Sequence, residues 1–230
     1  MKTLVVIPAR GGSKGVPGKN IKKLNGKLLI DYTVNAARVV FEDQNIIVST
    51  DDQNIKDSVE AKGLLVPFLR PNHLATDTAN SRDVILHAID FCEKNDNYFE
   101  TIVLLQPTSP FRTESHIREA LKLYNNSLDM VVSVKLTNSN PYYTLFEENK
   151  KGYLEKSKKG GYKRRQDIPD VYEYNGAIYI INIDSLKKMS IVNFKKVIKY
   201  EMNEYNSHDI DTQLDWFVAE SIIQNYLNEK

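Results

Sequence analysis

Residues 3–20 read TLVVIPARGGSKGVPGKN, in which a short run of β-branched and apolar residues is followed at once by a glycine-rich basic loop. An apolar run of this length that ends at a loop is typical of a buried parallel strand. In sheets built from alternating strands and helices, ligands bind where the strands end. The N-terminal stretch therefore predicts a parallel α/β sheet with a binding loop directly after its first strand.

The rest of the chain alternates between predicted strands and helices, as a doubly wound sheet requires. Strands are predicted at 46–48, 64–66, 101–105, 129–134 and 176–181, and helices near 28–41, 53–62, 84–92 and 113–126. A last helix carries one apolar stripe, made of Leu214, Phe217, Val218, Ile222 and Tyr226. The predicted class is α/β with a doubly wound, mostly parallel sheet.

One segment, at about 136–174, departs from this alternation. It is rich in tyrosine and lysine and contains Pro141, Gly152 and the pair Gly160-Gly161. These residues favour turns, so we interpret it as hairpin-like strands and loops inserted into a single domain that spans residues 1–230. The segment also holds eight cations between Lys150 and Arg165, for which a solvated basic loop is the ordinary explanation.

The composition excludes several classes of protein. The 230 residues carry 31 basic and 30 acidic side chains, without the strong positive charge of a dedicated nucleic-acid-binding protein. A hydrophobic content of 41% is enough for a full core, which excludes overall disorder. A single cysteine, Cys92, permits neither an intramolecular disulfide nor a four-cysteine zinc site, and it falls on an apolar helix face, so we expect it in the core. Without a signal peptide or a membrane-spanning run, we expect a cytoplasmic protein with no membrane or nucleic-acid partner.

The loop after the first strand has the chemistry of a triphosphate site. Its glycines let backbone N–H groups approach phosphate oxygens, and Arg10, Lys14 and Lys19 supply positive charge. The Walker pattern GxxxxGK[ST] fails, because Ser13 replaces its first glycine and Asn20 replaces its hydroxyl residue. The dinucleotide pattern GxGxxG fails as well, which weakens an oxidoreductase interpretation. The alternative to a triphosphate site is a flexible surface loop that is basic by chance.

The opening of the chain resembles the nucleotide-binding signature of the acylneuraminate cytidylyltransferases, also called CMP-sialic acid synthetases. The similarity covers IPARGGSKGVPGKNI at 7–21 almost residue for residue. Seven further blocks follow in order, at 48–51, 70–71, 77–79, 105–110, 164–167, 175–179 and 209–216. Seven ordered blocks along the whole chain make the resemblance specific.

The resemblance implies a Rossmann-like nucleotidyltransferase fold and a reaction between CTP and a nine-carbon sugar acid. The anomeric hydroxyl of the sugar attacks the α-phosphorus of CTP, giving a CMP-sugar and pyrophosphate with Mg²⁺, or alternatively Mn²⁺, as cofactor. The same reaction on legionaminic, pseudaminic or 3-deoxy-octulosonic acid stays open as an alternative. The resemblance also implies a homodimer, because the inserted segment of the family reaches into a partner subunit, and the chain ends before the extra C-terminal domain of some relatives.

The resemblance also implies roles for individual residues. Arg10, Lys19, Asp209 and Asp211 are the expected catalytic residues, and the two aspartates are the expected metal ligands. CTP is expected to contact Arg10, Gly11, Gly12, Ser13, Lys14, Lys19, Asn20, Arg70, Ala79 and Ser81. The sugar is expected to contact Gln106, Arg165, Gln166 and Asn175, with Arg165 on its carboxylate. For Ser81 a helix-capping role is equally open.

Geometry decides whether Asp209 and Asp211 can act together. In a helix, residues two apart point in nearly opposite directions, whereas in an extended segment they share one face. Thr212 and Asp215 have the spacing of a capping box, which predicts that the last helix begins at about residue 213 and leaves both aspartates in the extended approach. The alternative is that one aspartate caps the helix and the other is solvated. Asp51 and Asp52 follow a predicted strand and are expected to cap a helix or lie near a ribose.

Overall fold

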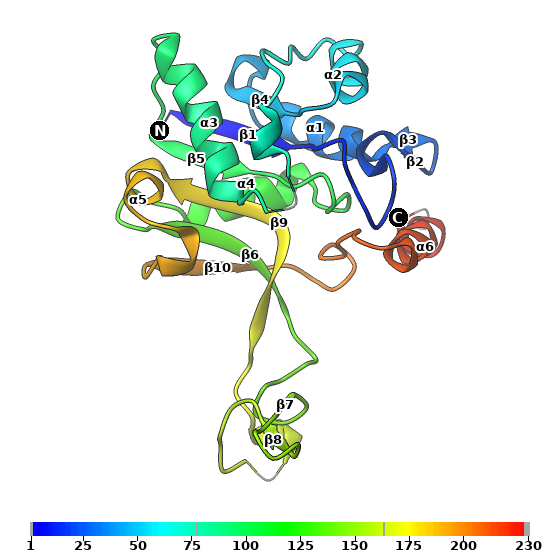
Figure 1. The fold of residues 1–230 in the computed structure, drawn as a ribbon, viewed down its shortest axis with the longest axis vertical. Helices are drawn as coiled ribbons and strands as arrows, with labels where there is room; N and C mark the ends of the chain where they lie inside the picture. Colours follow the sequence, from blue (N-terminus) through cyan, green and yellow to red (C-terminus); the bar gives the residue numbers. More distant parts are fainter. Residues whose placement is uncertain (1, 77, 163, 228–230) are drawn as a thin grey trace.

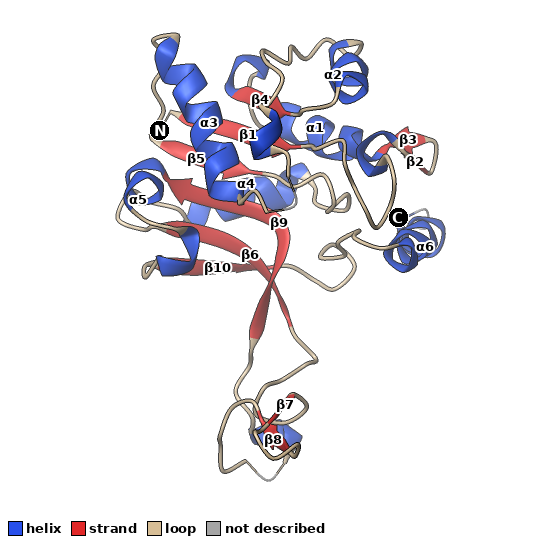
Figure 2. Ribbon diagram, in the orientation of Figure 1, coloured by secondary structure: helices blue, strands red, loops and turns tan. Residues whose placement is uncertain are grey.

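The centre of the computed structural model, which describes residues 2–76, 78–162 and 164–227, is a six-stranded sheet with helices on both sides (Figures 1 and 2). The strand order is β10-β6-β9-β5-β1-β4. Its strands are β1 (Thr3–Pro8), β4 (Ile46–Ser49), β5 (Thr101–Leu104), β6 (Met130–Leu136), β9 (Tyr172–Asn182) and β10 (Val197–Glu201). The α-helices are α1 (Leu29–Arg38), α2 (Gln53–Glu60), α3 (Ser81–Lys94), α4 (Glu114–Leu123), α5 (Ile183–Lys188) and α6 (Gln213–Ile222). Within the described ranges, none of the helices is long and apolar enough to span a bilayer.

Strand β1 explains why the sheet needs helices on both faces. It pairs in parallel with β4 and with β5, so neither of its edges is free. Successive side chains point to opposite faces: Val5 and Ile7 join the core under α1, α2 and α4, whereas Leu4 and Val6 join the core under α3 and α5. A strand buried on both faces has a continuous apolar sequence, which is the pattern that predicted it.

Strand β9 makes the sheet mixed, because it runs antiparallel to both of its neighbours, β5 and β6. The pairing of β9 with β6 is interrupted between Val132 and Val134, which pair with Tyr179 and Tyr174 respectively. Residues 175–178 of β9 therefore lie opposite the single residue Ser133 of β6 and form a bulge. Within this bulge, Gly176 adopts a positive φ of 75°. This irregularity displaces the backbone at the edge of a cavity described below.

Most predicted elements are confirmed, including the first strand, the helix with Cys92 on its buried face, and the mostly parallel sheet. The strand predicted at 64–66 is wrong. Leu64 and Val66 are buried and Leu65 is exposed, which gives a strand-like alternation, but the segment pairs with no other strand in the described part of the chain. Strand β10 and helix α5 were not predicted, because short amphipathic segments carry a weak periodic signal.

The last helix begins at Gln213 as predicted, but it buries a different face. Its core contacts come from Trp216, Ala219, Ile222 and Ile223, which pack against the loop after β1 through Val16 and Leu24. In the predicted stripe, Leu214 is 70% exposed and Phe217 is 65% exposed, and Val218 is also exposed. Only Ile222 of that stripe is buried, and the side chain of Tyr226 lies outside the described residues.

The inserted segment (residues 136–174) extends away from the sheet, between the ends of β6 and β9 (Figure 1). It contains the two-stranded hairpin β7 (Phe146–Glu148) and β8 (Leu154–Lys156) and the short 3₁₀ turn η4 (Arg165–Asp167). A second small hairpin, β2 (Lys23–Leu24) and β3 (Lys27–Leu28), follows the 3₁₀ turn η1 (Lys19–Ile21) next to the glycine-rich loop. Further 3₁₀ turns are η2 (Asp43–Asn45), η3 (Asn72–Leu74) and η5 (Ile191–Asn193), and the π-helical turn η6 (Ile223–Leu227) follows α6.

Candidate active site

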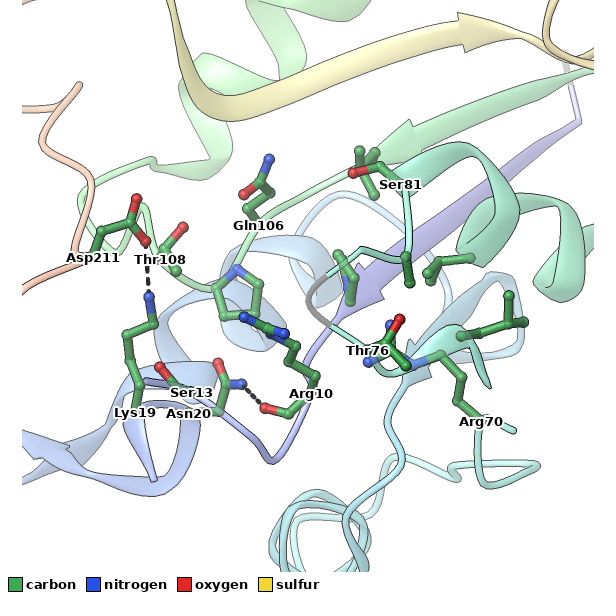
Figure 3. A pocket seen from close by; sticks show the side chains of 16 residues that line it. Arg10, Ser13, Lys19, Asn20, Arg70, Thr76, Ser81, Gln106, Thr108 and Asp211 are labelled. Carbon is green, nitrogen blue, oxygen red and sulfur yellow. Dashed lines mark hydrogen bonds and ion pairs between the residues drawn. The ribbon is translucent and has the colours of Figure 1, made fainter. Parts of the chain in front are cut away.

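A cavity of about 290 Å³ lies at the carboxyl ends of β1 and β5 (Figure 3). The loop after β1 contributes Arg10, Ser13, Lys19 and Asn20 to its wall. The rest of the wall is formed by Pro8, Arg70, Leu74, Thr76, Ala79, Ser81, Val84, Leu104, Gln106, Pro107, Thr108 and Asp211. Seven of the predicted CTP contacts thus line one cavity, whereas Gly11, Gly12 and Lys14 belong to the loop without forming part of its wall.

Lys19 connects the glycine-rich loop to the C-terminal part of the chain. It opens η1 and is only 8% exposed. Its ammonium donates to Oδ1 of Asp211 at 3.0 Å and to the carbonyl of Ile210 at 2.5 Å (Figure 3). A predicted phosphate-binding cation and a predicted metal ligand therefore touch, although 192 positions separate them in the sequence.

The loop keeps its course through short contacts that only small residues allow. The backbone of Gly15 lies against the backbone of Asp211, so a Cβ added there would stand 2.0 Å from the Asp211 carbonyl oxygen. The N–H of Gly11 donates to Asp51 at 3.1 Å, and the side-chain amide of Asn20 donates to the carbonyl of Arg10 at 2.9 Å. These contacts hold the loop against the end of β4 and against the segment before α6.

Asp209 and Asp211 precede α6 outside any helix, as predicted. Between them Ile210 is fully buried, and its N–H donates to the carbonyl of Thr108 at 2.9 Å. The charge of Asp211 acts on the carboxyl group of Asp209, so the two side chains lie near each other. The following Thr212 and Asp215 form the predicted capping box. The alternative in which one of the two aspartates caps α6 is therefore wrong.

The carboxylates differ in their surroundings. Burial raises the pKa of Asp209, and the charge of Asp211 raises it further, whereas Lys19 and the hydroxyl of Ser109, 3.4 Å away, oppose this shift. The side chain of Asp211 is 74% exposed and keeps its carboxylate at the cavity wall. The side chain of Asp209 is thus partly buried, whereas that of Asp211 is exposed at the cavity.

The donor set fits a cation that shares its ligands with a substrate. Among the residues that the structure describes, no three histidine, cysteine or acidic side chains lie close enough to hold a metal ion by themselves. Two carboxylates with a neighbouring phosphate-sized cavity match the way Mg²⁺ is usually bound, by one or two carboxylates and by substrate phosphates. Asp209 and Asp211 are the residues that would hold it.

The far end of the cavity is built around Arg70. This residue is buried, its Nη2 lies 3.6 Å from Oδ1 of Asp51, and both its Nε and its Nη2 are without a hydrogen bond in the described structure. Burial lowers the pKa of Arg70, and the carboxylate of Asp51 opposes this. Asp52 caps α2, as expected for one of these two acids. The cap of α3 is Asn80, which leaves Ser81 at the cavity and removes the capping alternative for it.

A second cavity, of about 470 Å³, adjoins the first, and Gln106 lines both. Its wall contains Lys135, Glu173, Tyr174, Asn175, Gly176, Tyr179, Glu204, Ser207, His208, Asp209 and Asp215. The bulge of β9 places Gly176 beside this wall, where a Cβ would lie 3.8 Å from both Gln106 and Asp209. Gln106 is thus the predicted sugar residue that connects the two cavities.

Asn175 lines the second cavity, and its side chain is held there by hydrogen bonds within the protein. Its amide oxygen accepts from Ser133 at 2.6 Å and from the N–H of Ala177, while its nitrogen donates to Ser207 at 2.9 Å and to the sulfur of Met202. All of its hydrogen-bonding capacity is used within the protein. Asn175 therefore holds the bulge of β9 in place at the cavity wall, and its contact with the sugar stays a prediction.

Arg165 and Gln166 are not brought to either of these cavities. Both lie exposed in η4 of the inserted segment, and Arg165 lines a separate cavity of about 140 Å³ with Asn140 and Asp170. The guanidinium of Arg164 pairs with Asp167 through two hydrogen bonds of 3.0 and 2.8 Å.

The predicted block at 77–79 contains Asp77, which lies outside the described residues.

Several wall residues were missed from the sequence, among them Tyr179, Thr76 and Thr108. Tyr179 lines the second cavity, and burial together with the charge of Asp209 raises its pKa to about 12. Thr76 and Thr108 line the first cavity. Thr108 and Tyr179 both stand inside motif blocks that the resemblance had picked out, so their position in those blocks was the available signal.

Known proteins resemble this chain over most of its length. A family model described as Cytidylyltransferase matches residues 4–225. A CMP-N,N'-diacetyllegionaminic acid synthase of Legionella pneumophila is 33% identical over 227 residues, covering 97% of each chain. An N-acylneuraminate cytidylyltransferase of Streptococcus agalactiae is 35% identical over 221 residues, and these cover 94% of this chain but 52% of the relative. Among solved structures, a CMP:2-keto-3-deoxy-manno-octonic acid synthetase complexed with CTP has the same fold, with a TM-score of 0.71 at 18% identity over 97% of this chain and 99% of that one.

Proposed function

Because the chain belongs to the cytidylyltransferase family, we propose that it transfers CMP from CTP to the anomeric hydroxyl of a nonulosonic acid of the sialic type. The observation that carries this proposal is the pair of adjoining cavities with Gln106 between them and with Lys19 and two carboxylates beside them. One cavity has the cations that a triphosphate needs, and the other is lined almost entirely by polar side chains, which suits a polyhydroxylated acid. The alternative is the same reaction on a related sugar acid, because some relatives are named for legionaminic acid.

CTP would lie in the first cavity with its phosphates at the glycine-rich loop. Arg10 and Lys19 supply positive charge there, and Ser13 and Asn20 supply polar groups. At the other end, Arg70 has guanidinium N–H groups without partners in the described structure, beside the small residues Ala79 and Ser81. A flat polar base fits between such groups, because buried donors gain most from a ligand that accepts their hydrogen bonds.

The sugar acid would lie in the second cavity, with its anomeric hydroxyl near Gln106 and pointing to the α-phosphorus. Attack by this hydroxyl forms the new P–O bond, and the bond from the α-phosphorus to the oxygen bridging to the β-phosphorus breaks. Pyrophosphate leaves with that oxygen, and the hydroxyl proton is released to solvent. Such a transfer asks the protein for alignment and for charge stabilisation, and it needs no covalent enzyme intermediate. Lys19 and Arg10 are placed to stabilise charge on the transferred phosphate and on the leaving group.

We propose Mg²⁺ as the cofactor, held by Asp209 and Asp211 together with the phosphates of the substrate. When bound, it would neutralise negative charge on the phosphates that react. The same oxygen ligands also suit Mn²⁺.

We also propose a homodimer in which the inserted segment completes the site of a second copy. The segment presents apolar side chains to solvent in the single chain, among them Phe146, Tyr153 and Leu154. Exposed apolar groups gathered on a projecting segment are typical of a protein interface. Arg165 and Gln166 lie on this segment, so they would reach a sugar acid in the partner subunit rather than in their own.

The test is pyrophosphate release in a mixture of the protein, CTP, Mg²⁺ and one of a panel of sugar acids. We expect release only with a nonulosonic or octulosonic acid present, and mass spectrometry of the product should give the mass of its CMP conjugate. The panel also discriminates sialic from legionaminic, pseudaminic and octulosonic acids. Absence of pyrophosphate with every acid would reject the function.

A further inference from the structure

Arg112 is an arginine with a role that the reaction described above does not assign. It follows the loop after β5 and is only 2% exposed. In the described chain it makes no ion pair with a carboxylate, and burial alone lowers its pKa, to about 9. Burying a guanidinium is costly unless its N–H groups find acceptors, so the acceptors show what the residue holds.

The acceptors of Nη1 are three backbone carbonyls from two parts of the chain. They belong to Gln106 at 3.2 Å, Ser109 at 3.4 Å and Ala177 at 3.3 Å. Gln106 and Ser109 lie in the loop after β5, whereas Ala177 lies in the bulge of β9. The guanidinium therefore ties the loop to the bulge.

These three carbonyls belong to the wall of the second cavity or to its immediate support. The side chain of Gln106 lines both cavities, and the hydroxyl of Ser109 contacts Oδ1 of Asp209 at 3.4 Å. Ala177 directly follows Gly176, which lines the second cavity. A shift of the guanidinium would move all of these groups relative to the glycine-rich loop.

Thr33 of α1 holds the other end of the guanidinium. Its hydroxyl accepts from Nη2 at 2.6 Å and donates to the carbonyl of Gln106 at 3.4 Å, and the residue is fully buried. The same hydroxyl therefore orients Arg112 and contacts the carbonyl that Arg112 holds. The loop of the second cavity is thus anchored to a helix that packs beneath β1.

We propose that Arg112, oriented by Thr33, is a positioning residue for the acceptor half of the active site. It holds Gln106, Asp209 and the β9 bulge at the distance from the nucleotide that in-line attack requires. The inference rests on the proposed function, because it assigns the acceptor to the second cavity. It predicts that weakening the Arg112 network harms use of the sugar acid while CTP still binds normally.

The test uses Thr33→Val, which keeps the shape of the side chain and removes its hydroxyl. We expect kcat/KM for the sugar acid to fall roughly 10- to 100-fold, as for other losses of a supporting hydrogen bond in an active site. The dissociation constant for CTP, measured by calorimetry without the acid, should stay within about twofold of wild type. Thr33→Ser keeps the hydroxyl and should restore kcat/KM.

Thr101→Val is the matched control. Thr101 is a fully buried threonine at the opposite end of β5, and its hydroxyl has no hydrogen bond in the described structure. This variant should keep wild-type kinetics with both substrates. If Thr33→Val does not fold, Thr33→Ala removes the same hydroxyl without a larger apolar group, and Arg112→Lys keeps the charge but loses the planar fork.

Equal weakening of CTP binding and of acceptor use would overturn the proposal, because it would indicate general loosening of the fold. Unchanged acceptor kinetics in a folded hydroxyl-free variant, or failure of Thr33→Ser to restore them, would overturn it as well. Wild-type protein is assayed first. Absence of turnover there rejects the proposed function, whereas normal wild-type turnover with an unaffected Thr33→Val rejects only the role of Arg112.

Discussion

The ammonium of Lys19 lies 3.0 Å from a carboxylate oxygen of Asp211, which joins the loop after the first strand to the segment before the last helix. The contact neutralises a nearly buried cation and an exposed carboxylate in the protein without substrate. Both groups have other partners during the proposed reaction, namely phosphate oxygens for Lys19 and Mg²⁺ for Asp211. Substrate binding would therefore exchange this ion pair for two ligand contacts.

Lys19→Ala should lower kcat by roughly 10²–10³-fold, by analogy with the loss of one positioned charge-stabilising donor. The reason is that charge on the leaving pyrophosphate grows in the transition state, so the contact strengthens there. Steady-state kinetics with CTP varied would measure it. A rise confined to the KM for CTP would instead show that Lys19 only holds the nucleotide.

Asp209→Asn and Asp211→Asn should each remove most of the activity, because an amide is a weak ligand for a hard cation. Their stabilities should change in opposite directions. Asp209 is a partly buried carboxylate with a raised pKa, so its ionisation destabilises the fold, and the amide should raise the unfolding midpoint at pH 7. Asp211→Asn leaves the ammonium of Lys19 without its carboxylate, so the midpoint should fall.

The effect of Asp209→Asn on the stability of the fold should depend on pH. A folded pKa above the unfolded value of 3.8 means that Asp209 contributes stability at pH values below 3.8, and this contribution is lost as the pH rises through the raised pKa. The gain from Asp209→Asn should therefore be largest at neutral pH and disappear on acidification towards pH 4. Thermal unfolding without divalent metal, from pH 4 to pH 8, would measure it. A gain that does not depend on pH would contradict the assignment to ionisation.

Gly15→Ala should destabilise the protein, because its Cβ would collide with the backbone of Asp211. Overpacking of this kind costs about 1–3 kcal/mol, which corresponds to a fall in the unfolding midpoint of roughly 2–12 °C for a chain of this size. Gly12→Ala is the comparison within the same loop, since nothing lies within 4 Å of the added Cβ. Differential scanning calorimetry of both variants should show a lower midpoint for Gly15→Ala alone.

Arg165→Lys should raise the KM for the sugar acid and leave CTP binding near wild type, because lysine keeps the charge but loses the fork that grips a carboxylate. Arg164→Lys is the control. Its guanidinium already pairs with Asp167 on the exposed surface, where an ion pair contributes little to stability, so this change should be close to neutral. Loss of CTP binding in both variants would place the segment on the triphosphate side of the site.

Much of the candidate site could be predicted because short stretches of sequence fix local geometry. The capping box at Thr212 and Asp215 fixed where α6 begins, and it leaves Asp209 and Asp211 before the helix. The roles of single residues were less predictable. Asn175 stands in a motif block, yet its amide is saturated by Ser133, Ala177, Ser207 and Met202, which come from three different parts of the chain.

Most of the strands and helices of the sheet, the position of the basic loop and the start of the last helix could be predicted from the amino-acid sequence. These features depend on period, capping and turn chemistry between near neighbours in the chain. The three-dimensional fold was needed to see which face of α6 is buried, that β9 is antiparallel and bulged, and that Lys19 contacts Asp211. Each of these features depends on packing between segments that are distant in the sequence. In α6, the face that carries Trp216 is buried instead of the face that carries Leu214 and Phe217, because Trp216 packs against the loop after β1. Local patterns carry no information about such long-range fits. Seven of the expected CTP residues could be named from the sequence, whereas the contacts among them and the placement of Arg165 in a separate cavity required the fold.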